Sequence, residues 1–156
     1  MTEDKQKLMK TAFRLLSRRP HSRKELINKL TIRGYSFHDA AAMAKECERL
    51  GYINDELFAE DYLKELAQRG QGEMMIKMKM LKKGLPMELI EDKLSELNTM
   101  SLEIERAKTV LAAKMTALNR ETDTRKRRDK AYRFLASRGF NSEAIRGAME
   151  GFNENN

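Results

Sequence analysis

Residues that could carry out catalysis are few in this sequence. His21 and His38 stand beside expected helix starts, and no cysteine or second nearby histidine gives the spacing of a metal site. The segment RGQGEMM, which contains Gly70, lacks the preceding strand and the lysine and hydroxyl of a phosphate-binding loop. Ser22 and Glu25, in SRKE, match a helix capping box better than an activated nucleophile. We therefore predict that the protein is not an enzyme and uses no metal or cofactor.

Basic residues, in contrast, are abundant. Lysine and arginine total 31 against 24 acidic residues, which gives a net charge of +7 and a pI near 9.5. This balance favours a polyanion, or a complex that contains one, as the partner, although a merely solvated surface has the same composition. The candidate partner-binding or nucleic-acid-binding residues are Arg18, Arg19, Arg23, Lys24, Lys77, Lys79, Lys82, Lys83, Arg125, Lys126, Lys130 and Arg133.

The densest basic stretch is RETDTRKRRDKAYRF, residues 120–134. It leads directly into Ala131, Phe134 and Leu135, whose helical spacing predicts a folded segment. Cations in the first turns of a helix oppose its macrodipole, by roughly 0.3–1 kcal/mol for each close charge. A local rule broken without a visible structural benefit indicates a functional role.

The faces of this predicted helix follow from its period of 100° per residue. We take Ala131, Leu135 and Arg138 as its buried stripe and expect Arg127 and Arg128 near the edge of the core. The cations expected on the outer face and its flanks are Arg125, Lys126, Lys130 and Arg133.

The composition predicts an all-α protein. There are two prolines and no tryptophan, and no stretch has the alternating β-branched and aromatic pattern of a strand. Cys47 is the only cysteine, so no internal disulfide is expected and a reducing compartment is indicated. No segment resembles a signal peptide or approaches the roughly 20 apolar residues of a membrane span, so we expect a cytoplasmic location.

Three glycine turns mark an internal repeat. LTIRGYS, MLKKGLP and LASRGFN place an apolar residue four before the glycine, a basic residue immediately before it and an apolar residue after it. The glycines Gly34, Gly84 and Gly139 recur about every fifty residues, a period typical of repeat proteins. Apolar residues eight before, six after and ten after each glycine are Leu26, Ile76, Ala131, Ala40, Ile90, Ile145, Ala44, Leu94 and Met149.

This pattern predicts a helix, a tight turn and a second helix in each unit, with a further amphipathic segment ahead of each pair. In the second unit that segment carries Phe58, Tyr62 and Leu66 as its apolar stripe. The predicted domains are three three-helix repeats, at residues 5–54, 55–99 and 100–152. Such repeats stack mainly on their neighbours, so we expect an elongated, curved, solenoid-like body.

A short corner is expected between the first two repeats. Gly51 supplies a left-handed residue that ends one helix, and Asn54 suits the N-cap of the next. Ile53 is placed to pack on Phe58 as a hydrophobic staple.

The segment GEMMIKMKMLKKG, residues 72–84, is rich in methionine. An adaptable partner surface is one interpretation. Core packing is the one we favour, because Ile76, Met80 and Leu81 match the expected buried positions.

Several motifs within these repeats are specific enough to indicate a protein family. LGYINDELFAEDY, RGQG, IKMKMLKKGLP and KAYRFLASRGFNSEAI resemble the RecX family of bacterial regulatory proteins, and the similarity extends from about Leu8 to Phe152. The chain departs from the family pattern in its short N-terminal lead, its methionine-rich fifth helix and Asn54, where aspartate is more frequent.

The resemblance implies three tandem three-helix repeats that modulate the RecA recombinase. It also implies binding in the groove of the RecA filament on single-stranded DNA, with inhibition of filament extension, ATP hydrolysis and strand exchange. We therefore expect the RecA filament as partner, single-stranded DNA as a second candidate, no membrane, and a monomer. The alternative is a sequence-nonspecific nucleic-acid-binding helical module. A plain helical adapter ranks third.

Overall fold

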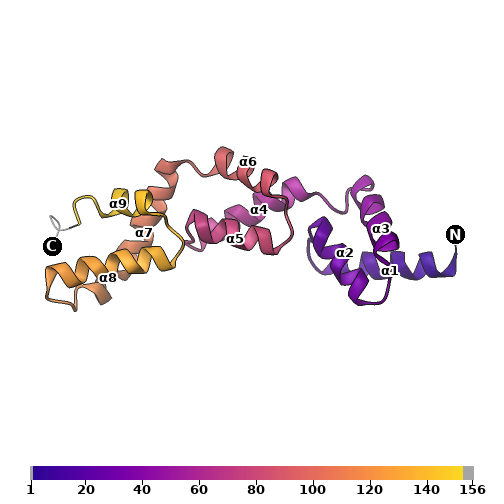
Figure 1. The fold of residues 1–156 in the computed structure, drawn as a ribbon, viewed down its shortest axis with the longest axis horizontal. Helices are drawn as coiled ribbons and strands as arrows, with labels where there is room; N and C mark the ends of the chain where they lie inside the picture. Colours follow the sequence, from indigo (N-terminus) through magenta and orange to yellow (C-terminus); the bar gives the residue numbers. More distant parts are fainter. Residues whose placement is uncertain (1, 153–156) are drawn as a thin grey trace. The chain divides into compact units, whose positions relative to one another are not determined.

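The computed structural model describes residues 2–152, and Figure 1 shows their fold. Within this range the chain forms nine α-helices and no strand, which confirms the predicted all-α class. The helices are α1 (Glu3–Arg18), α2 (Arg23–Ile32), α3 (Phe37–Arg49), α4 (Asp55–Gln68), α5 (Glu73–Lys82), α6 (Met87–Leu97), α7 (Met100–Leu118), α8 (Thr124–Ser137) and α9 (Ser142–Met149). None of the described helices is both long and apolar enough to span a membrane.

Several helix starts follow from their cap residues. Ser22 and Glu25 form the predicted capping box, in which each side chain accepts a hydrogen bond from the other residue's backbone N–H. The side chain of Asn54 accepts from the Leu57 N–H at 3.1 Å, so α4 begins as expected. Asp123 caps α8 in the same way, which places the basic run inside a helix.

The described chain divides into two compact units. One holds Met80–Ile90 together with the described residues up to Asp61. In it α1, α2 and α3 surround a buried cluster that contains Leu8, Ala12, Leu15, Leu26, Leu30, Ala40, Met43, Ala44, Cys47 and Ile53. Burial raises the pKa of the Cys47 thiol, so this side chain acts as an uncharged apolar filler.

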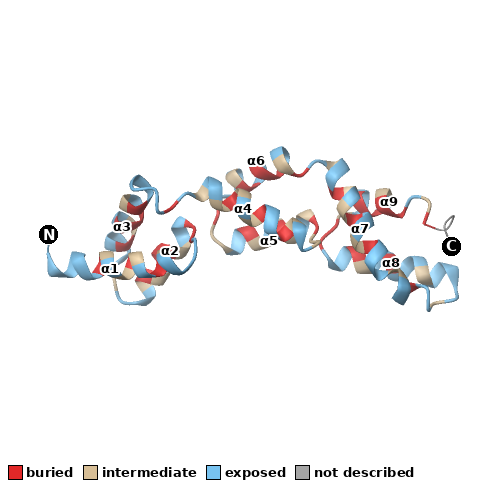
Figure 2. Ribbon diagram, turned by 180° about the vertical axis from the view of Figure 1, so that it is seen from behind, coloured by how far each residue is buried: buried red, intermediate tan, exposed pale blue. Residues whose placement is uncertain are grey.

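The other unit holds Tyr62–Lys79 and the described residues from Glu91 onward. Here α7, α8 and α9 pack around a cluster that contains Ala107, Leu111, Leu118, Ala131, Leu135, Phe140, Ala144 and Ile145. Figure 2 shows buried residues recurring along the described helices.

The apolar residues that recur in the three repeats are buried in the structure. The apolar residues at the aligned positions eight before, six after and ten after the three turn glycines are all buried. So are Leu30, Met80 and Leu135, four before each glycine. The predicted three-helix repeats are therefore confirmed as a pattern of helices and buried faces.

Some side-chain placements were predicted incorrectly. Leu81 was expected to be buried but is 41% exposed, and Met74 and Met78 are also exposed, so only part of the methionine-rich helix fills a core. The buried stripe of α4 is Ala59, Leu63 and Leu66, at i, i+4 and i+7 spacing. Phe58 and Tyr62 lie on a neighbouring face of the helix and are only partly buried.

Arg138 was predicted in the buried stripe of α8 and is exposed instead. It occupies the C-cap of the helix, beyond the last regular turn, and its guanidinium lies 5.3 Å from the centre of the Phe134 ring. The helical period therefore stops applying one residue before Arg138.

Candidate partner-binding surface

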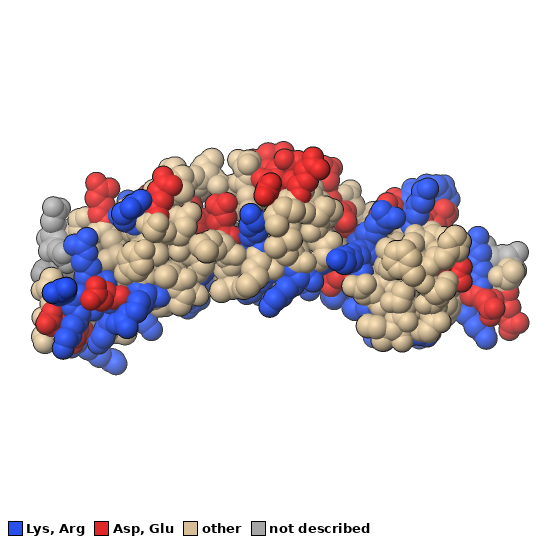
Figure 3. All heavy atoms as spheres, viewed as in Figure 1, with Lys and Arg blue, Asp and Glu red and all other residues tan. Residues whose placement is uncertain are grey.

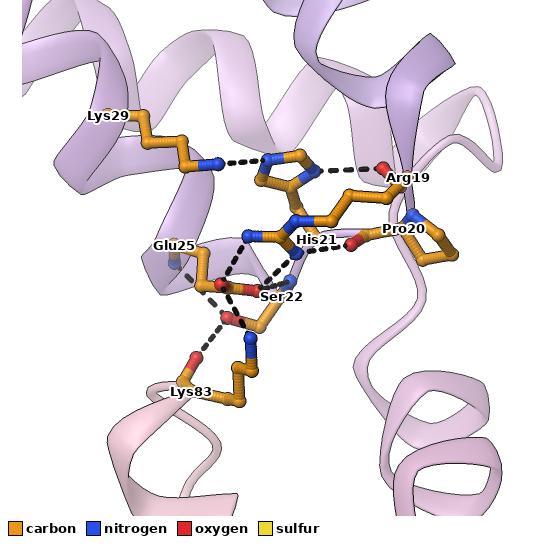
Figure 4. A network of polar contacts seen from close by, with 7 residues as sticks. All are labelled: Arg19, Pro20, His21, Ser22, Glu25, Lys29 and Lys83. Atoms are coloured by element: carbon orange, nitrogen blue, oxygen red, sulfur yellow. Dashed lines mark hydrogen bonds and ion pairs between the residues drawn. The ribbon is translucent and has the colours of Figure 1, made fainter. Parts of the chain in front are cut away.

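A polar joint connects the start of α2 to the turn after α5 (Figure 4). The Ser22 hydroxyl donates to the Lys83 carbonyl and accepts from the Glu25 backbone N–H at 3.1 Å. The Glu25 carboxylate in turn accepts from Arg19 at 2.9 Å and lies 3.6 Å from the Lys83 ammonium. Arg19, the Ser22 N–H and Lys83 thus share the half-buried Glu25 carboxylate.

This joint keeps Glu25 ionised. Burial by itself would raise the pKa of the Glu25 carboxyl. The hydrogen bonds from Arg19 and from the Ser22 N–H, together with the positive charges of Arg19 and Lys83, outweigh burial and lower that pKa.

His21, which the sequence places beside a helix start, is buried beside the same joint. Its Nδ1 lies 2.9 Å from the Arg19 carbonyl and its Nε2 lies 2.9 Å from the Lys29 ammonium. A lysine ammonium only donates, so Nε2 accepts and Nδ1 carries the proton. Burial, helped by the charges of Arg19 and Lys29, lowers the pKa of His21 and keeps the ring neutral.

A similar joint connects the start of α5 to the turn after α8. The backbone N–H groups of Gly72 and Met74 donate to the carbonyls of Arg138 and Gly139, at 2.8 and 3.0 Å. A Cβ at position 139 would overlap Met75, so glycine is required for this close approach. The first turn of a helix therefore meets a repeat turn in both joints.

A buried carboxylate supports the second joint. Glu103, on α7, is fully buried and accepts from the Glu73 backbone N–H at 2.8 Å, from Asn98 at 2.6 Å and from Arg106 at 3.0 Å. Because a buried charge needs such partners, this network fixes the start of α5 on α7. Burial, and then the charge of Glu103, raises the pKa of Glu73.

The predicted basic residues of the first group are largely used inside the structure. Arg19 binds Glu25, and Arg23 Nε lies 3.2 Å from Glu48. The aliphatic stem of Lys24 packs where a Cβ on Gly84 would lie. Arg18 is exposed at the last turn of α1, where its charge favours the helix dipole.

The predicted basic residues of α5 and of the turn after it differ in their partners and exposure. Lys77 lies 3.6 Å from Glu91, Lys79 is half-buried, and Lys82 is exposed. Lys83 belongs to the Glu25 joint described above. Lys79, Lys82 and Lys83 stand at i, i+3 and i+4, so they lie on one side of the helix, and Lys77 lies apart from them.

The start of α8 is where predicted cations come together on an exposed helix. Figure 3 shows Lys and Arg atoms gathered over this helix. Arg125 and Lys126 are exposed, and no described acidic group lies within ion-pair distance of either. Lys130 has a long contact of 3.9 Å with Glu121, and Arg133 Nε lies 3.4 Å from the Asp129 carbonyl.

The prediction for the two inner arginines of α8 was half right. Arg127 is half-buried, its Nη1 lies 3.4 Å from the Glu121 carbonyl, and its Nε has no hydrogen-bond partner among the described residues. Arg128 was expected at the core edge but is exposed.

Sequence reasoning missed a small cluster beside the basic run. Arg128, Tyr132 and Arg146 line an open cavity of about 550 Å³ with Met149 and Phe152. The i, i+4 spacing of Arg128 and Tyr132 is visible in the sequence. Arg146 comes from α9, so only the packing of α8 on α9 reveals that it joins them.

Comparison with known proteins gives consistent matches along the chain. Models of three RecX three-helix domains match it in order: the first over residues 9–44, the second over 54–94 and the third over 102–149. The regulatory protein RecX of Chromohalobacter salexigens is 33% identical over 142 residues, which cover 88% of each chain. That of Chlorobium phaeobacteroides is 35% identical over 153 residues, covering 96% of this chain and 95% of its own.

Solved structures agree in fold. The crystal structure of RecX from Lactobacillus salivarius superimposes with a TM-score of 0.89 at 24% identity, over 99% of each chain. A second crystal structure, of a regulatory protein RecX, gives 0.81 at 19% identity over 94% of this chain and 71% of the other.

Proposed function

Because this chain belongs to the RecX family of regulatory proteins, we propose that it binds the RecA recombinase filament on single-stranded DNA and inhibits its growth and ATP hydrolysis. In this proposal it modulates DNA repair and recombination by binding, not by catalysis. It acts as a monomer in the cytoplasm, through repeats at residues 5–54, 55–99 and 100–152.

Beyond family membership, the proposal is supported by the basic residues at the start of α8. Its first turn contains no acidic residue and places Arg125 and Lys126 at the positive end of the helix dipole. Asp123 at the N-cap offsets part of this repulsion, but the two cations remain unfavourable at that end of the helix. An anionic partner, such as DNA phosphate or an acidic surface of the recombinase, would remove that repulsion.

A second candidate function is nucleic-acid binding without the recombinase. Tyr132 is partly exposed beside Arg128 and Arg146, and an aromatic ring flanked by cations suits a stacked base with its phosphates. Asp129 and Glu150 also line this cavity and oppose an anionic ligand.

Two measurements on the purified chain test the proposal. The rate of ATP hydrolysis by RecA on single-stranded DNA should fall as the protein is added, whereas the protein alone should hydrolyse no ATP. Fluorescence anisotropy should show tighter binding to RecA filaments than to the same DNA without RecA. Equal affinity for both, with no effect on hydrolysis, would favour the nucleic-acid-binding module instead.

A further inference from the structure

The turn at Gly34 (residues 33–35) is the first of three related turns, and the two later ones each receive the start of a helix. A Cβ at position 84 would lie 2.6 Å from the Cβ of Lys24, in the first turn of α2. At Gly139 the neighbour is Met75, in the first turn of α5. At Gly34, no described atom lies within 4 Å of the same position.

The turns at Gly84 and Gly139, on which the starts of α2 and α5 pack, also make polar contacts with those helix starts. The Lys83 carbonyl accepts from the Ser22 hydroxyl, and the carbonyls of Arg138 and Gly139 accept backbone N–H groups at the start of α5. The first N–H groups of any helix lack partners inside the helix, and the Gly139 turn supplies acceptors for those of Gly72 and Met74, whereas the Gly84 turn accepts the hydroxyl of the N-cap Ser22. Each occupied turn is thus a binding site for the N-terminal turn of a helix.

The Gly84 turn adds a charge contact. The Lys83 ammonium, on the residue before the glycine, lies 3.6 Å from Glu25, which is an acidic residue in the first turn of α2. Acidic residues are favoured at that end of a helix by its dipole. Arg33 holds the position of Lys83 in the first repeat, and its side chain is exposed.

The surface around Gly34 also carries apolar side chains. Ile32 is 83% exposed and Phe37 is 70% exposed, more than any other large apolar side chain in the described residues. Terminal repeats of solenoid proteins usually present a polar outer face. An apolar surface at this position therefore indicates a partner.

We propose that the Gly34 turn binds the N-terminal turn of a helix on the recombinase. This inference rests on the proposed function. An acidic residue in the first turn of that helix pairs with Arg33, its N–H groups meet the carbonyls of the turn, and its apolar side chains cover Ile32 and Phe37.

A second copy of the chain fits this surface less well. The second helix of the third repeat, α8, is the equivalent helix that a second copy would offer. Its N-cap is Asp123, but its first turn has no acidic residue and carries Arg125 and Lys126, which would repel Arg33. Charge therefore argues against a second copy, and the proposed function makes the recombinase the occupant.

The test compares Gly34→Asn with Gly51→Asn. Both glycines have positive φ, of 99° and 84°, and neither has a described atom within 4 Å of its Cβ position. Asparagine tolerates this backbone conformation, so both variants should fold and melt alike. Gly34→Asn should bind RecA filaments, assembled on oligothymidylate with a non-hydrolysable ATP analogue, about tenfold more weakly than the parent. Gly51→Asn should bind like the parent, and neither change should alter binding to the oligonucleotide alone.

A second pair of variants makes the test independent of backbone strain. Phe37→Ser should weaken filament binding, whereas Leu57→Ser, at another exposed apolar side chain of the same unit, should not. Arg33→Glu should weaken it through charge reversal.

Three results would overturn the inference, and one would bear on the proposed function instead. If Gly34→Asn and Phe37→Ser bound the filament like the parent, the Gly34 turn would not be a binding site for the recombinase. An equal loss in Gly51→Asn or Leu57→Ser would show that the effect is not local. Self-association of the parent in analytical ultracentrifugation, abolished by Gly34→Asn, would show that the occupant is a second copy. Failure of the parent itself to bind the filament would refute the proposed function.

Discussion

The bare α-carbon of Gly139 lies directly on Met75, so that a Cβ at position 139 would overlap the Met75 Cβ. Gly34 holds the equivalent place in the first repeat, with a nearly identical φ of 99° against 97°, but has no described neighbour within 4 Å. Gly34 and Gly139 therefore share one reason for glycine, the positive φ of the backbone. Only Gly139 has the second reason, which is close packing against another helix.

Replacing each of these glycines by alanine should therefore have unequal effects. Both variants lose stability because alanine disfavours positive φ. Gly139→Ala should lose about 1–3 kcal/mol more than Gly34→Ala, because it also overpacks the joint with α5. Urea denaturation followed by circular dichroism measures the difference. Equal losses would mean that α5 moves away from the turn without cost.

The buried His21 should make stability depend on pH. Its pKa is lowered from 6.5 in the folded protein, so the unfolded chain takes up a proton at a higher pH than the folded chain does. The stabilising contribution of the neutral ring is present above pH 6.5 and is lost as the pH falls below it. Protonation would place a second cation against Lys29, with Arg19 nearby and Glu25 as the compensating negative charge.

The melting temperature of the parent should accordingly fall between about pH 7 and pH 5.5. His21→Gln should show a flatter profile over this range, even if its melting temperature is lower throughout. His38→Gln is the matched control, because His38 is exposed, and it should keep the slope of the parent. A parent-like slope in His21→Gln would assign the pH dependence to other groups.

Glu103 should be among the more costly residues to remove. Glu103→Ala leaves Arg106 and the start of α5 without their shared acceptor, and breaking a buried pair of this kind costs on the order of 3 kcal/mol. Glu105→Ala, which removes an exposed carboxylate 3.5 Å from Lys108 on the same helix, should cost little. Chemical denaturation of the two variants tests this contrast.

The same network predicts a change in titration. Glu103→Gln removes the negative charge that helps to raise the pKa of Glu73, so that pKa should move down toward its ordinary value. An NMR titration of the Glu73 carboxyl measures it. An unchanged pKa would mean that burial alone accounts for the shift.

The basic face of α8 should contribute to binding and not to stability. Replacing Arg125, Lys126, Lys130 and Arg133 by glutamine should leave the melting temperature near that of the parent, or raise it slightly, because repulsion with the helix dipole is relieved. Inhibition of RecA should fall. If these side chains contact phosphates of single-stranded DNA, the log–log salt slope should decrease by about 0.7 for each contact removed.

A variant with the same change in net charge provides the control. Lys7, Lys10, Arg14 and Lys45 are exposed on α1 and α3, and their replacement by glutamine should reduce inhibition much less. Equal loss in both variants would mean that only total charge matters. Unchanged inhibition in the α8 variant would show that its cations form a solvated surface.

The sequence by itself determined the helices, their caps and most of the buried faces. These features depend on residues within a few positions of one another, as in the Ser22–Glu25 capping box, or on apolar spacing repeated from one unit to the next. Local reasoning failed where the helical period ended, at Arg138, and where alternative apolar faces competed, as in α4.

Only the tertiary structure decided which cations remain available to a partner. Arg19, Arg23 and Arg125 are alike in the sequence, but Glu25 and Glu48 pair with the first two and no described acid reaches the third. Ion pairs of this kind join residues that chain folding brings together, so sequence spacing does not predict them. The same holds for the turns, because Gly34, Gly84 and Gly139 share one sequence pattern and differ only in whether a helix start packs on them.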